Sequence, residues 1–171
     1  MIRGTALAAL LAPAVMLGTA QAAPVAATGY TVNTFATAPV GSSAPDSIAV
    51  VGGNVYVGYG NGGDPTGAGG AASTIAEYNT SGTLLGSTSV VGHNDGLRYN
   101  PGTGTLWALQ NEDANANLVQ IAPGTLAKSP VYNFTSSPHG GGYDDVAFSG
   151  GSAFVSASNP ANNPNTAPAI V

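Results

Sequence analysis

A short sequence motif, an Asp followed by mostly apolar residues, occurs three times, as Asp46-Ser47-Ile48-Ala49-Val50, Asp95-Gly96-Leu97-Arg98-Tyr99 and Asp144-Asp145-Val146-Ala147-Phe148. Successive copies of the motif begin 49 residues apart. Each is followed by a Gly-rich turn, a second apolar run and then an Asn, which is Asn61, Asn111 or Asn159. Self-similarity at a fixed period of about 40–50 residues indicates a repeat architecture.

Short apolar runs separated by turn residues fill the repeats, which lie near 46–91, 95–137 and 144–171. We predict strands at 46–51, 54–59, 73–78, 83–91, 96–99, 105–109, 117–121, 130–135, 146–148 and 153–156, the start of another at 167–171, and an opening strand at 30–36. This pattern predicts an all-β fold, a partial β-propeller with about three four-stranded antiparallel blades. Because propellers typically close with about 4–8 blades, we expect a ring that this chain fills only in part. Either the sequence is part of a longer protein, which we favour, or two chains pair to close the ring.

Residues 1–22 have the features of a secretory signal peptide. Arg3 supplies a positive start, 6–18 is an apolar run, and Ala20-Gln21-Ala22 is a small-residue cleavage site. We therefore expect an exported propeller domain over 23–171, which is secreted, periplasmic or on the cell surface. No later run is long or apolar enough to predict membrane insertion of that domain.

The charge balance excludes several function classes. The chain has 3 Lys and Arg against 8 Asp and Glu, and no Cys. So few cations argue against nucleic-acid binding, which requires a basic surface. The absence of Cys excludes a disulfide framework and thiolate chemistry.

The acidic residues cluster in the predicted fold. In an antiparallel pair, the start of the first strand and the end of the second lie at the same edge. Seven of the eight acidic residues fall at that edge, and Glu77 alone falls elsewhere. Oxygen-rich settings suit hard cations such as Ca²⁺. We predict a site for Ca²⁺ or another divalent cation among Asn94, Asp95, Asp46, Asp144, Asp145 and Glu112.

Structural roles are the alternative for these residues. An Asp or Asn present in every repeat commonly accepts backbone N–H bonds in a nearby turn. His93 and His139 fit either a metal pair or a general base, or ordinary loop positions, which is the reading we favour.

One segment is similar to a known family. His93-Asn-Asp-Gly-Leu-Arg-Tyr-Asn-Pro-Gly-Thr-Gly-Thr-Leu-Trp-Ala108 resembles the gluconolactonase and senescence-marker-protein family of six-bladed propellers, and NHL-like and lactonase-like propellers more broadly. The resemblance implies that Asn94 binds Ca²⁺ or Zn²⁺ in a central channel. It also implies hydrolysis of sugar lactones or related esters by metal-bound water and a carboxylate base. The family's Glu ligand corresponds by order to Asp46, which is a departure from the family pattern.

Two functions follow from these observations. The first is a non-catalytic binding or surface scaffold module with a divalent-cation site, whose partner is a small molecule or another extracellular ligand. The second is a metal-dependent lactonase or esterase-like hydrolase. Open strand edges also predict self-association.

Overall fold

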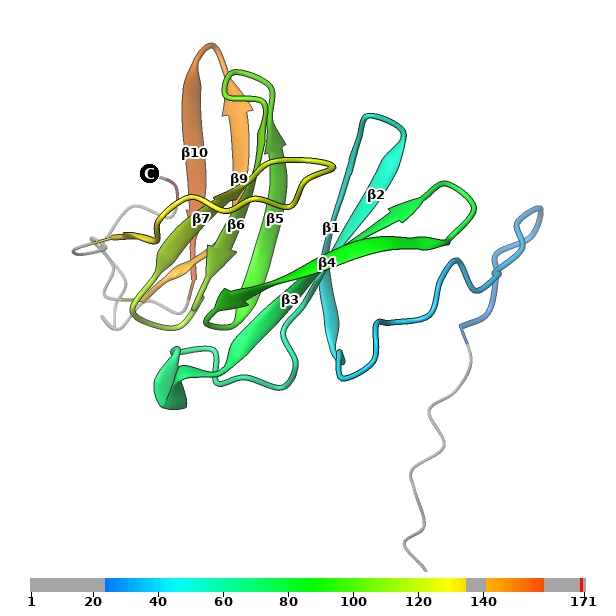
Figure 1. The fold of residues 1–171 in the computed structure, drawn as a ribbon, viewed down its shortest axis with the longest axis horizontal. Coiled ribbons are helices and arrows are strands. Elements are labelled where there is room, and N and C mark those ends of the chain that lie inside the picture. Colours follow the sequence, from blue (N-terminus) through cyan, green and yellow to red (C-terminus); the bar gives the residue numbers. More distant parts are fainter. Residues whose placement is uncertain (1–23, 135–140, 159–169, 171) are drawn as a thin grey trace, which may run out of the picture. The chain divides into compact units, whose positions relative to one another are not determined.

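The computed structural model describes residues 24–134, 141–158 and 170. The chain divides into two compact units, Met1–Asn33 and Thr34–Val171. In the first unit, the described residues 24–33 form a turn in which the Tyr30 N–H donates to the Ala27 carbonyl (3.0 Å). The second unit contains all of the described strands (Figure 1).

The strands form three antiparallel sheets in chain order. Sheet 1 contains β1 (Pro45–Val51), β2 (Asn54–Tyr59), β3 (Ala72–Asn79) and β4 (Leu84–Val91); sheet 2 contains β5 (Asn94–Asn100), β6 (Thr105–Gln110), β7 (Asn117–Ile121) and β8 (Tyr132–Asn133); sheet 3 contains β9 (Tyr143–Ser149) and β10 (Ser152–Ala157). A short 3-10 turn, η1 (Ala68–Gly70), precedes β3. The predicted all-β fold with four-stranded antiparallel sheets is therefore confirmed for the first two repeats.

Local sequence explains the hairpins within each sheet. Gly52 and Gly53 connect β1 to β2 with φ of 61° and 80°, and Gly150 and Gly151 connect β9 to β10 with φ of 58° and 83°. Such left-handed pairs match the twist of two-residue hairpins, and glycine adopts them without steric cost. The second repeat uses the turn of 101–104 instead, which is two residues longer than 52–53, and its Asn111 follows β6 directly, whereas Gly60 separates β2 from Asn61. The net difference is the one extra residue of the second repeat.

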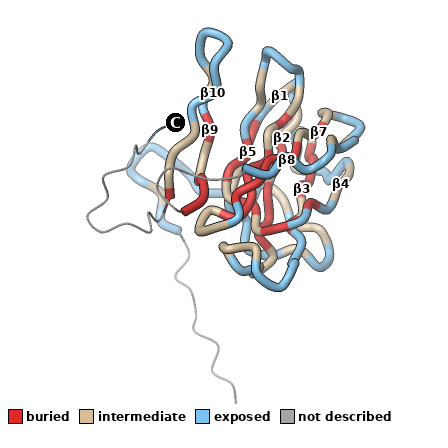
Figure 2. Tube along the Cα trace, turned by 90° about the vertical axis from the view of Figure 1, so that its left-hand side faces the viewer, coloured by how far each residue is buried: buried red, intermediate tan, exposed pale blue. Residues whose placement is uncertain are grey.

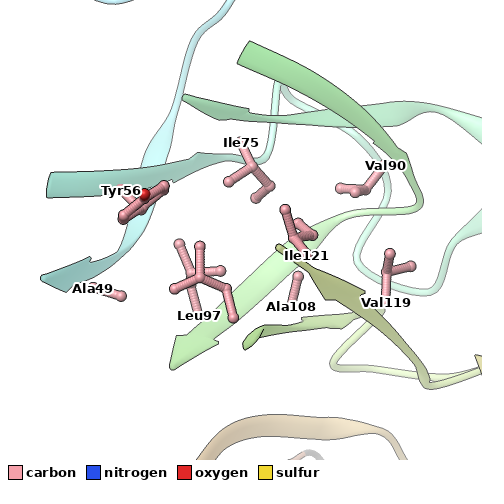
Figure 3. Close-up of a cluster of buried hydrophobic side chains, with 9 residues drawn as sticks. Ala49, Tyr56, Ile75, Val90, Leu97, Ala108, Val119 and Ile121 are labelled. Atoms are coloured by element: carbon pink, nitrogen blue, oxygen red, sulfur yellow. The ribbon is translucent and has the colours of Figure 1, made fainter. Parts of the chain in front are cut away.

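The sheets pack face to face through apolar side chains. Between sheets 1 and 2 lies a cluster from seven strands, in which side chains of the two sheets point toward one another (Figure 3). A second cluster, with Leu109, Leu118 and Val146, joins sheets 2 and 3. Buried residues are concentrated on the two middle strands of sheet 1, β2 and β3, and of sheet 2, β6 and β7 (Figure 2). The first strands of the sheets, β1, β5 and β9, lie next to one another.

Several predicted elements differ from the structure. Residues 30–36 form no strand, because their alternation of side chains finds no ladder partner among the described residues. The strand expected at 130–135 shortens to Tyr132–Asn133. Of the strand expected at 167–171, only Ile170 lies in the described residues, and it forms an antiparallel bridge with Ser156. The described sheets do not close into a ring.

Candidate functional site: an acidic edge

Each sheet begins with a β-bulge that carries an Asp. In sheet 1 the register runs from the pair Pro45–Tyr59 to Ser47–Gly58, so Asp46 has no partner on β2. In sheet 2, Asp95 is skipped in the same way between Asn94 and Gly96. A bulge inserts one extra residue and re-aims its side chain. The repeat therefore presents an Asp at the same edge of successive sheets.

Sheet 3 contains an irregularity of the same size, one extra residue on its first strand. Between the pairs Tyr143–Ala157 and Val146–Val155, β9 has both Asp144 and Asp145, whereas β10 has Ser156 alone. Gly96 lets β9 approach β5 here, because a Cβ at that position would lie 2.5 Å from the Asp144 carbonyl oxygen. We call this edge, where β1, β5 and β9 begin, the acidic edge.

The acidic edge surrounds an open pocket of about 340 Å³. Five of the six predicted metal ligands line it, together with four other residues: Asp46, Asp95, Glu112, Asp144 and Asp145, with Ser47, Ile48, Leu97 and Arg98. The starts of the first strands and the loop after the second strand of sheet 2 therefore lie at the same edge, as predicted. Three repeats contribute to a single pocket.

His93 joins two of the carboxylates in an arrangement that can hold a metal ion. Ligand atoms of Asp46, His93 and Asp95 all lie within 4.8 Å of one another. His93 Nδ1 lies 2.6 Å from Asp95 Oδ1, and the Asp95 side chain is only 3% exposed. The other Asp95 oxygen accepts the Glu112 N–H (3.1 Å). Carboxylate and imidazole ligands together are compatible with several divalent cations, Zn²⁺ and Mn²⁺ as well as Ca²⁺.

The crowding of carboxylates changes their ionisation. Burial raises the pKa of Asp95 from 3.8 to about 6, although the neighbouring His93 lowers it. Burial also raises the pKa of Glu112 from 4.5 to about 8, with further contributions from a hydrogen bond with Asp144 and from the charges of Asp95, Asp144 and Asp113. A raised carboxyl pKa means that the charged form is poorly solvated or repelled. Burial therefore disfavours the charged forms of Asp95 and Glu112, and the neighbouring carboxylates add negative charge around Glu112.

One cation of the chain partly offsets this charge. The Arg98 guanidinium contacts Asp145 (2.6 Å), and both side chains are nearly half exposed. An exposed ion pair of this kind stabilises a fold only weakly. It does, however, connect sheet 2 to sheet 3 across the pocket.

Asn94 does not line this pocket, although it was predicted as a ligand from its sequence context. Its side chain is fully buried, and its Oδ1 accepts a hydrogen bond from Ser47 Oγ (2.7 Å). Its Nδ2 donates to the carbonyls of Gly96 (3.2 Å) and Leu109 (3.0 Å). In this structure Asn94 connects sheet 1 to sheet 2 beneath the acidic edge.

The repeated Asn residues have the structural role that was the alternative reading. Asn61 has φ of 55°, donates its N–H to the Ser43 carbonyl (3.0 Å) and accepts the Ser43 N–H at Oδ1 (3.0 Å). Asn111, with φ of 64°, makes the same reciprocal pair with His93 at 2.8 and 2.9 Å. Each of these Asn residues thus holds the segment that immediately precedes the first strand of its own sheet. Asn159 and His139 lie outside the described residues.

Two features of the site were not recognised from the sequence. His93 was assigned to an ordinary loop, but Asn111 fixes its backbone next to Asp95. The bulges were also missed, although a polar residue that interrupts apolar alternation at the same place in each repeat is a signal for them.

Comparisons with known proteins add no further identification. No family model, curated protein or solved structure matches the chain. Within the described residues, none of the helices has the length and apolar character needed to span a bilayer.

Proposed function

We propose that this chain is an exported repeat protein of the β-propeller type that binds a divalent cation at its acidic edge and acts as a binding or scaffold module. The observation that carries the proposal is the convergence of Asp46, His93 and Asp95, because two of these residues, Asp46 and Asp95, also line one pocket with three further carboxylates. Oxygen ligands at this density favour Ca²⁺, whereas His93 favours a transition metal. The sequential sheets, stacked with their first strands together, support the propeller arrangement.

Calorimetric titration with Ca²⁺, Mn²⁺ and Zn²⁺ tests the cation site. We expect one cation to bind with near-unit stoichiometry and the Asp46→Asn variant to bind at least about tenfold more weakly, which corresponds to about 1.4 kcal/mol. Asp46 is exposed, so this substitution leaves the fold intact. Asp64→Asn is the matched control, because Asp64 is exposed but hydrogen-bonds to Thr66 outside the pocket. Equal affinity in both variants would argue against the site.

A metal-dependent lactonase or esterase-like hydrolase is the second candidate function. It is favoured by one observation: Asp95 contacts His93 and lines the same pocket as Glu112, whose pKa is raised to about 8. A carboxyl group with a pKa near neutrality can exchange protons during hydrolysis. A screen of sugar lactones and aryl esters with and without added cation tests this function. Turnover that is abolished by chelation and by Glu112→Gln would favour the enzyme over the scaffold.

Export is a separate element of the proposal and rests on residues 1–22, which lie outside the described residues. Expression with the complete N-terminus, followed by N-terminal sequencing of the exported product, tests it. A mature chain that begins near Ala23 is the expected result.

A further inference from the structure

Each sheet has one face toward the preceding repeat and one toward the following repeat, which we call its N-side and C-side faces. The C-side face of sheet 1 contains the cross-strand pair Ala49–Tyr56. Both residues are buried against the N-side face of sheet 2, where Leu97 is 1% exposed. Leu97 pairs with Ala108, which is fully buried in the same cluster. This interface shows how one repeat fits the next.

The N-side face of sheet 1 contains the equivalent apolar pairs without the equivalent burial. Ile48–Val57 occupies the place of Leu97–Ala108, and Val50–Val55 occupies the next place along the strands. Ile48 is 56% exposed and Val50 is 66% exposed. Alternation places both on the opposite side of β1 from Ala49.

Part of this face is already covered. Ala36 and Ala38 pack against the cluster of Tyr59, Ala76 and Tyr78. The Phe35 ring also contacts that of Tyr78, with the ring centroids 6.2 Å apart. This segment covers the face over β2 and β3, and the open patch is therefore the part over β1.

The C-side face of sheet 3 has the complementary pattern. Ala147 pairs with Phe154 in the register that joins Ala49 to Tyr56, so a small residue again faces an aromatic ring. Phe154 is 45% exposed, and a shallow pocket of about 240 Å³ lies beside it, lined also by Ala147 and Ile170. The chain thus carries both halves of an interface that it forms internally between sheets 1 and 2.

We propose that the C-side face of sheet 3 in one copy of this chain docks on the N-side face of sheet 1 in a second copy. The occupant is a second copy because this chain itself carries the matching aromatic and small side chains in the matching register. The cross-strand pairs at the core of the contact contain no charged residue. The two charged residues that line the pocket beside Phe154, Arg98 and Asp145, are paired with each other (2.6 Å), so docking buries no unpaired charge. Such a head-to-tail contact is heterologous, and it closes a ring of two copies when the rotation between them permits. The inference does not depend on the cation site.

Sedimentation velocity of the full chain over a wide dilution series, in the presence of a chelator, tests the proposal. We expect reversible association of the wild-type chain. Val50→Glu and Phe154→Glu should each remain monomeric, because each places a buried charge in every head-to-tail contact. Val131→Glu is the matched control, since Val131 is 44% exposed at the outer edge of sheet 2. This variant should associate like the wild type.

Mixing the two monomeric variants gives the decisive result. The Val50→Glu chain keeps an intact sheet 3, and the Phe154→Glu chain keeps an intact sheet 1, so an equal mixture should form a dimer and nothing larger. A wild-type chain that stays monomeric, a Phe154→Glu chain that associates normally, or a mixture that stays monomeric would each overturn the proposal. Circular dichroism checks that each variant folds, and Val50→Ser and Phe154→Ser replace any variant that does not.

Discussion

Asp46 in sheet 1 and Asp95 in sheet 2 occupy the same position of the repeat and the same kind of bulge, yet their surroundings differ. Asp46 is exposed, whereas the Asp95 side chain is 3% exposed and its pKa is raised to about 6. Sheet 2 is covered on both faces, but the N-side face of sheet 1 is open over β1. The repeat thus determines where a side chain points, and the neighbouring sheets determine how deeply it is buried and how it ionises.

The equivalent apolar residues Leu97 of sheet 2 and Ile48 of sheet 1 should show the largest difference in the effect of a substitution on stability. Leu97→Ala should lower the free energy of unfolding by about 2–5 kcal/mol, because it removes a fully buried side chain and leaves a cavity. Ile48→Ala should change it by less than about 0.5 kcal/mol when the chain is monomeric. Urea denaturation at low protein concentration measures both values. Similar losses in the two variants would show that the face of sheet 1 is covered in solution.

The reciprocal Asn residues give the next contrast. Asn111→Ala should cost about 2–3 kcal/mol, since it removes a bond to the His93 N–H and leaves alanine in a left-handed conformation. Asn61→Ala should cost less, because Asn61 is more exposed than Asn111. Thermal unfolding compares the two variants. Asn111→Gly is the control, and it should regain only the conformational part, about 1 kcal/mol.

The carboxylates of the acidic edge predict a pH dependence of stability. Because the pKa values of Asp95 and Glu112 are raised in the folded state, the native chain binds more protons than the unfolded chain between pH 4 and 8. Stability of the cation-free protein should therefore fall as the pH rises through this range. Midpoints of thermal unfolding at successive pH values, with a chelator present, measure the effect.

Substitution and cation binding provide the controls for this pH dependence. Glu112→Gln should flatten the upper part of the profile, near the raised pKa of about 8. A bound cation should offset the loss and release protons, so its affinity should increase with pH. A cation-free profile that rises between pH 5 and 8 would contradict the assigned pKa shifts.

The smallest expected effect concerns Gln110, which occupies the place of Tyr59 in the repeat. The Tyr59 hydroxyl is hydrogen-bonded to that of Tyr78 (2.9 Å), whereas the fully buried Gln110 amide has no partner within the described residues. Gln110→Met should therefore raise the free energy of unfolding by about 1 kcal/mol. A loss measured by urea denaturation would instead indicate that a buried water satisfies this amide.

Much of the fold followed from the sequence because its signals are local. Apolar alternation placed β2 and β7 with their correct bounds, and the Gly pairs marked the hairpins. The opening segment at 30–36 alternates equally well but forms no strand. Pairing requires a neighbouring strand, and alternation alone contains no information about one.

The candidate site followed from the sequence only in part. Of the seven carboxylates predicted at one edge, five line the pocket there, whereas Asp64 and Asp113 do not line it. Asn94 was predicted as a ligand from its short sequence context. The direction of its side chain, however, depends on the local strand register, which that context does not contain. The bulge at Asp95 decides this, because it turns Asp95 toward the pocket and leaves Asn94 buried beneath it.

The bulges also have a consequence for how such a protein can change over time. Because the residue at 46 or 95 has no partner in the ladder, it can be exchanged without altering any backbone pairing. Even its deletion would bring the flanking pairs into direct succession and preserve the facing of every later side chain. At the exposed position 46, the scaffold and the chemistry of the edge are therefore encoded by separate residues, and new ligand preferences can arise there without rebuilding the sheets. Asp95 differs, because it also accepts the Glu112 N–H.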